Sequence, residues 1–248
     1  MSRLPSPTKF GGWLPLVTTD LKYTSPYWTP DEEINSHALE RARSLVASPA
    51  AAEHLARYYA TDSNYAGTTF TDLERNEPDA ITAADLLAVT ALPVEVGPHA
   101  IRTFDRSSDE ISEKLRALNT ELRLDTVDPA ATAEAMASLY ELVKSSLRRA
   151  GAWSSNAWVT ASKICARKRP NLFPVRDNVV LDLLCLPKTY PVDWPAFQAL
   201  VADQPMMRTL DDQVAEAAGR EGVDVGDPSL RLRHLDVVLW MHAMNPLD

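Results

Sequence analysis

Apolar residues recur along this chain with the period of an α-helix, and polar segments with helix-starting residues separate the apolar runs. In one such segment Asn156, Thr160, Lys163 and Arg167 fall on one helical face, while Trp158 falls toward the other. The strict alternation that a half-buried strand requires is nearly absent. The pattern therefore predicts an all-α fold of about ten helices.

Proline marks the starts of several of these helices. In Thr29-Pro30, Ser48-Pro49, Asp128-Pro129 and Asp227-Pro228, a capping residue precedes a proline that suits the first helical position. Thr29 with Glu32, and Ser107 with Glu110, have the spacing of a capping box. We expect helices to begin near residues 30, 49, 83, 107, 129, 155, 178, 194, 206 and 228.

The domain organisation follows from the same pattern. Residues 1–28 are rich in proline, glycine and aromatic residues, and we expect them to form an irregular N-terminal arm. We expect residues 29–248 to form a single helical domain, either as one body or as two helical lobes with a hairpin region at 129–186. The pattern over residues 61–81 predicts a long connecting loop, and a loop of this length is a candidate for function.

The composition narrows the class of protein without identifying a reaction. Hydrophobic residues make up 45% and charged residues 24% of the chain, as in an ordinary globular protein. The eight glycines form no phosphate-binding loop, and the five histidines form no metal-ligand pair. Cys165 and Cys185 are too few for a four-cysteine zinc site, and we expect both to be buried. With no apolar run of membrane-spanning length, we expect a cytoplasmic protein without a cofactor, a metal or a membrane partner.

Charge is distributed unevenly along the chain. The net charge is −9, yet residues 144–176 contain eight basic residues and no acidic one, leaving 17 basic and 34 acidic residues elsewhere. Such a segment suggests an anionic partner, although a solvated face that pairs with the protein's own acids is equally compatible. The candidates for phosphate or anion binding are Lys163, Arg167, Lys168, Arg169 and Arg176.

Asp177 is the candidate catalytic residue. It follows the extended Pro174-Val175-Arg176 segment and stands at the N-cap of an apolar helix, where backbone N–H groups favour an ionised carboxylate. Capping is the more common role, but such a carboxylate can also stabilise a developing cation or activate water. Tyr65, Phe70 and Trp153 are candidate pocket residues, since aromatic rings stack on bases; the alternative is that Tyr65 and Phe70 fasten their loop to the core.

The order helix, Gly151 turn, helix, proline-rich segment and Pro-Val-x-Asp resembles the helix-hairpin-helix DNA glycosylase superfamily. In that superfamily the hairpin binds the DNA backbone and the aspartate serves base excision, so the resemblance implies a catalytic Asp177. Two positions depart from the pattern. Asn156-Ala157-Trp158 occupies the place of the second hairpin glycine, and Val159 stands where bifunctional members carry a lysine nucleophile. The resemblance therefore implies a monofunctional enzyme.

A longer resemblance covers most of the chain. Ala161-Ser162-Lys163, the Arg167–Pro170 run and Pro174–Asp177, with Tyr65-Ala66-Gly67 and Leu235–Trp240, resemble an uncharacterised bacterial family known only as a domain of unknown function. Our first hypothesis is nucleobase or nucleotide recognition on a helix-hairpin-helix-like scaffold, in its most specific form a DNA glycosylase, with DNA or a nucleotide-like anion as partner. The alternatives are a non-catalytic binding module and an enzyme acting on a small anionic metabolite. The net negative charge weighs against DNA.

Overall fold

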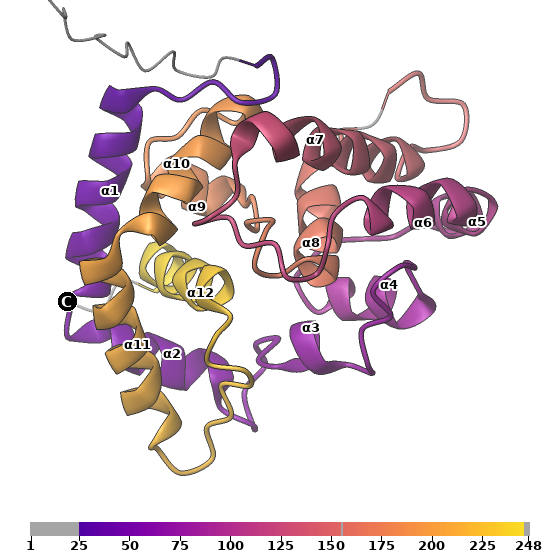
Figure 1. Cartoon of the computed structure of the whole chain (residues 1–248). Coiled ribbons are helices and arrows are strands. Elements are labelled where there is room, and N and C mark those ends of the chain that lie inside the picture. Colours follow the sequence, from indigo (N-terminus) through magenta and orange to yellow (C-terminus); the bar gives the residue numbers. More distant parts are fainter. Residues whose placement is uncertain (1–24, 155, 246–248) are drawn as a thin grey trace, which may run out of the picture.

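The computed structural model describes residues 25–154 and 156–245, and over these residues the chain is all-α (Figure 1). The expected fold class is thus confirmed. The helices of the described ranges are α1 (Glu32–Val46), α2 (Ala50–Tyr59), α3 (Thr69–Asp72), α4 (Ala83–Thr90), α5 (Pro98–Arg106), α6 (Ser108–Arg116), α7 (Pro129–Ser146), α8 (Trp158–Lys168), α9 (Asn178–Leu183), α10 (Tyr190–Ala202), α11 (Gln204–Ala218) and α12 (Arg231–Met244). None of them is both long and apolar enough to cross a membrane.

Two of these twelve helices were not expected from the sequence. Helix α3 is a single turn inside the predicted loop at 61–81, too short to produce a periodic pattern. Helix α5 buries only Ala100 and Phe104, so its apolar stripe is narrow. The predicted N-terminal arm falls mostly on residues 1–24, which lie outside the described ranges.

Helix capping explains where several elements begin, and it corrects several expectations. Of the four capping residues that precede a proline, only Asp128 caps its helix as expected: α2 has Pro49 as its N-cap and α12 begins at Arg231, with no side-chain cap at either start. Thr82 and Asp85 form a reciprocal capping box at α4, and Asp128 caps α7 ahead of its proline. Asp31 rather than Thr29 caps α1, because its carboxylate accepts from the backbone N–H groups of the first turn. Ser107 makes no side-chain cap, since α6 follows α5 directly without an extended residue between them.

The helices pack as two groups. Helices α3 to α8 contact mainly one another, and α1, α2 and α9 to α12 form the second group, as Figure 1 shows. Helix α12 lies centrally in the second group, where it contacts α1, α2, α9 and α11.

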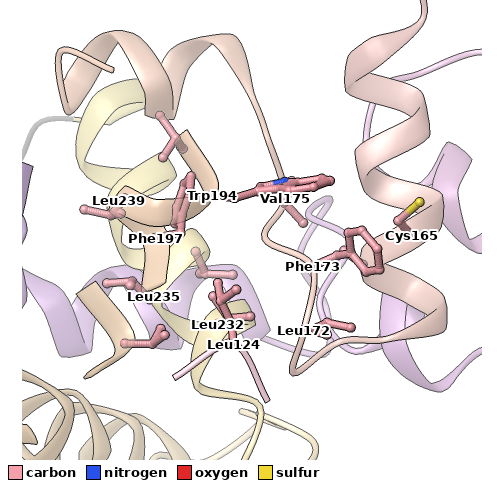
Figure 2. Close-up of a cluster of buried hydrophobic side chains, with 14 of the residues drawn as sticks. Leu124, Cys165, Leu172, Phe173, Val175, Trp194, Phe197, Leu232, Leu235 and Leu239 are labelled. Atoms are coloured by element: carbon pink, nitrogen blue, oxygen red, sulfur yellow. The ribbon is translucent and has the colours of Figure 1, made fainter. Parts of the chain in front are cut away.

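One hydrophobic core joins the two groups. Figure 2 shows Trp194 of α10 beside Val175 and Phe173, which precede α9, with Cys165 of α8 beyond them. The rings of Phe173 and Trp194 meet edge to face with their centroids 5.7 Å apart. Cys165 is buried as expected, whereas Cys185 is exposed, in a left-handed turn with φ of 55°.

Candidate functional site

All five cations proposed to bind phosphate are buried, and four of them lie deepest. Arg167, Lys168, Arg169 and Arg176 are each 2% exposed or less. The expectation of a cationic surface at these four positions is therefore wrong. A buried cation must be paired with acids or carbonyl oxygens, and the structure supplies both.

Arg167 and Lys168 share one buried acid, Asp85 of α4. The Arg167 Nε lies 3.2 Å from Asp85 Oδ1, and the Lys168 Nζ lies 2.8 Å from Oδ2. The same side chains donate to backbone carbonyls of the irregular segment after α3: Arg167 to Leu73 at 2.6 Å, and Lys168 to Glu77 at 2.6 Å. Because this segment leaves carbonyls without helical partners, the two cations complete its hydrogen bonding.

Arg169 and Arg176 have comparable internal roles. Arg169 donates to the carbonyls of Leu115 at 2.6 Å and Leu118 at 2.5 Å, at the end of α6. The Arg176 Nε lies 2.9 and 2.7 Å from the two carboxylate oxygens of Asp193 in α10. The segment before Asp177 is therefore held by buried charge pairing.

Lys163 is the exception among the five cations. Its Nζ lies 3.3 Å from Asp177 Oδ2, and both residues line a cavity of about 430 Å³. The cavity lies between the two helix groups, since α2 and α12 provide one side while α8 and the end of α4 provide the other. Its lining residues are Tyr58, Asn64, Tyr65, Ala66, Ala91, Leu92, Pro93, Lys163, Val175, Asp177, Val179, Arg233, Asp236, Val237, Trp240 and Met244.

Asp177 has the predicted capping role and also reaches the cavity. Its Oδ1 accepts from the Val179 N–H at 3.0 Å at the start of α9, which leaves Oδ2 for Lys163. The preceding backbone is fastened to α8, because the Arg176 N–H donates to Ser162 Oγ at 3.1 Å. Both oxygens of this carboxylate are thus oriented by neighbouring groups.

A second carboxylate, Asp236 of α12, lines the same cavity. Its Oδ2 accepts from the Arg233 guanidinium at 2.5 Å, while its Oδ1 is buried and has no hydrogen-bond partner. Burial is the main cause that raises the pKa of Asp236, and the negative charge of Asp177 adds to it, while Arg233 opposes it. The net result is a pKa of about 6. Arg233 also donates to the Tyr58 hydroxyl. The two aspartates therefore occupy different electrostatic environments.

Aromatic rings form another part of the wall. Tyr58 stacks on Tyr65 with ring centroids 5.5 Å apart and an interplanar angle of 23°. Trp240 of α12 meets Tyr65 edge to face at 6.0 Å. The four charged residues that line the cavity are Lys163, Arg233, Asp177 and Asp236, so their formal charges cancel. A wall of this kind suits a flat, uncharged ligand.

The structure brings together only some of the predicted site residues. Asp177, Lys163 and Tyr65 line the cavity. Phe70 belongs to the core, with the Arg233 guanidinium over its ring at 4.8 Å. Trp153 is 98% exposed in the segment between α7 and α8 and does not line this cavity.

Most of the cavity residues on α2 and α12 were not predicted from the sequence. Arg233, Asp236 and Trp240 are spaced i, i+3 and i+7 on α12, and Tyr58 comes from α2. The available signal was a pair of opposite charges and a tryptophan on one face of a helix whose other positions are mostly apolar.

Comparison with known proteins identifies the family of the chain. No match to the chain was found among curated proteins or among solved structures. A family model described as a family of unknown function, DUF6308, matches residues 51–243, which include every residue that lines the cavity except Met244. Because this match covers well over half of the sequence, the chain belongs to the DUF6308 family.

Proposed function

We propose that this protein binds a nucleoside-type ligand in the cavity and hydrolyses its N-glycosidic bond with the help of Asp177. The observation that carries the proposal is the carboxylate of Asp177, held by Lys163 and the Val179 N–H at the wall of a cavity bounded by aromatic rings.

The chemistry requires a fixed negative charge. Breaking the bond between a base and its sugar develops positive charge on the sugar ring, as in other glycoside hydrolyses. A preoriented carboxylate in a partly water-excluded cavity stabilises that charge without having to reorganise. The Asp177 side chain is 17% exposed, so it faces the cavity while its orientation is kept by Lys163.

The size and charge of the cavity support a neutral ligand. A volume of about 430 Å³ lies within the usual range for small-molecule sites. The aromatic wall of Tyr58, Tyr65 and Trp240 offers surfaces for the faces and edges of a base. Because the carboxylate of Asp177 would repel a nearby negative charge, a neutral nucleoside fits better than a small anionic metabolite.

Two sources could present the same nucleoside chemistry, namely a free nucleoside and a nucleotide within DNA. The free nucleoside is favoured because all five cations expected to bind phosphate are buried and paired internally, and because the net charge of the chain is −9.

The test is release of free base, measured by chromatography. The wild-type protein is incubated with a panel of ribonucleosides and deoxyribonucleosides and, separately, with single-stranded and duplex oligonucleotides. We expect base release from at least one free nucleoside. We expect Asp177→Asn to lower the rate about 100-fold or more, because its amide keeps the N-cap but lacks the charge. Asp182→Asn, at an exposed ion pair with Lys188, is the matched control and should keep full activity.

Three results would overturn the proposal. Base release from oligonucleotides alone would assign the activity to nucleic acid rather than to free nucleosides. Binding of nucleosides without any release would favour a non-catalytic module. Equal activity of Asp177→Asn and wild type would remove the carboxylate from the reaction.

A further inference from the structure

Asp236 has an oxygen that the proposed role of Asp177 leaves unexplained. Asp236 lines the cavity and is 5% exposed, and its Oδ1 is buried without a hydrogen-bond partner. A buried polar atom without a partner is costly, and native proteins keep such atoms where a ligand or a reaction uses them. The unpaired oxygen therefore points to a contact with the ligand.

The surroundings of the two aspartates distinguish their chemistry. Asp177 has an ammonium group and a backbone N–H as partners, which both favour an ionised carboxylate. Asp236 has one guanidinium partner at Oδ2 and lies in a more buried position. The titratable and charged groups around Asp236 are Arg233 on its own helix, Tyr58 from α2, Lys163 from α8 and Asp177 before α9.

We propose that Asp236 is the acid that protonates the leaving base, an inference that rests on the proposed N-glycoside hydrolysis. The proton on Oδ1 moves to a ring nitrogen of the base while the bond between that base and the sugar C1′ breaks, and the bonding electrons go to the base. A water oxygen then bonds to C1′, and the proton that it releases returns to Asp236. The net reaction consumes one water and yields the free base and the sugar.

This assignment is consistent with the pKa of the Asp236 carboxyl. General acids work best when their pKa lies near the working pH, and burial moves the pKa of Asp236 toward that range, to about 6. It also defines the substrate class, since an acid is needed for unmodified nucleosides, whose bases leave poorly as anions. A substrate with a good leaving group, such as 4-nitrophenyl β-D-ribofuranoside, does not need one.

The experiment compares these two kinds of substrate in wild type and in Asp236→Asn. We expect the variant to lower kcat on a nucleoside by about 100-fold or more, the usual contribution of a general acid. On 4-nitrophenyl β-D-ribofuranoside we expect a loss of less than about tenfold, because its leaving group departs without a proton. Asp177→Asn should instead slow both substrates, since both develop charge on the sugar.

Equal losses on both substrates in Asp236→Asn would show a positioning role and overturn this inference, while the function assigned to Asp177 would stand. If wild type releases neither base nor nitrophenolate, the proposed function fails and this inference fails with it. The pH profile of the wild type provides a readout that needs no variant. Nucleoside hydrolysis should fall as pH rises above about 6, where Asp236 loses its proton. A profile without this fall would also overturn the inference.

Discussion

Replacing Asp85 by alanine should destabilise the protein strongly, because it leaves two cations buried without an acid. Asp85 is 1% exposed and pairs with both Arg167 and Lys168. It also accepts from the Thr82 N–H at 2.9 Å and so completes the capping box of α4. The substitution removes an acid and a cap together, and the two contributions must be separated.

The magnitude follows from those two roles. Removing one partner of a buried ion pair typically costs about 3–5 kcal/mol, since the remaining charge loses its compensation. Loss of a helix cap costs about 1 kcal/mol. We therefore expect Asp85→Ala to lower the free energy of unfolding by roughly 4–6 kcal/mol, and Thr82→Ala, which removes only the cap, by about 1 kcal/mol.

Urea unfolding followed by circular dichroism measures both variants against wild type. Asp79→Ala is the matched control: Asp79 lies 3.8 Å from Arg169, but its side chain is 48% exposed, so its loss should cost less than about 1 kcal/mol. If Asp85→Ala proves no more destabilising than Thr82→Ala, then the buried cations do not depend on this acid, and the reasoning is wrong.

Three further predictions concern pH, backbone conformation and an exposed side chain. Because burial raises the pKa of Asp236 from 3.8 to about 6, this residue takes up a proton on folding, and its contribution to stability is lost as pH rises through that interval. Urea titrations at pH 4 and pH 7 should therefore show Asp236→Asn gaining stability relative to wild type at the higher pH; an unchanged difference would indicate an ordinary carboxyl. Gly226→Ala should lower the melting temperature more than Gly151→Ala. Both glycines have positive φ, but only at Gly226 would an added Cβ meet Thr68 Cγ2, at 3.0 Å. Equal decreases in melting temperature would show that the loop at Gly226 accommodates the methyl group. Trp153→Ala should change the free energy of unfolding by less than about 0.5 kcal/mol and leave base release unaffected, whereas a clear loss of activity would bring this segment into the site.

The helices were largely predictable from sequence because their signals are local. Asp128-Pro129 marks a helix start within two residues, and Asp128 caps α7 in the structure; α4 likewise begins at Ala83, where a helix was expected. Asp177 was identifiable in the same way, since it follows an extended segment and begins an apolar helix. Its contact with Lys163 involves only α8 and the start of α9, which follow one another in the chain.

The burial of the cations could not be predicted in this way. Arg167 pairs with an acid 82 positions away, and Arg169 donates to a carbonyl 54 positions away. Nothing in the local pattern distinguishes such side chains from a solvated cationic face, because their partners become neighbours only when the two segments pack. Asp236 was missed for a similar reason, since its chemical environment includes Asp177 and Lys163 from other elements.

The central position of α12 has a consequence for how a ligand reaches the cavity. This helix contacts four others and contributes Asp236 and Trp240 to the wall, so its backbone amides should exchange with solvent deuterium only when the whole protein unfolds. The segment at residues 60–68, which carries Tyr65 beside Trp240, consists mostly of turns and bends and is more exposed. Its amides should exchange through local opening, and a bound nucleoside should slow exchange there while leaving α12 unchanged. The wall of the cavity thus has a rigid part, α12, and a neighbouring part that opens, residues 60–68.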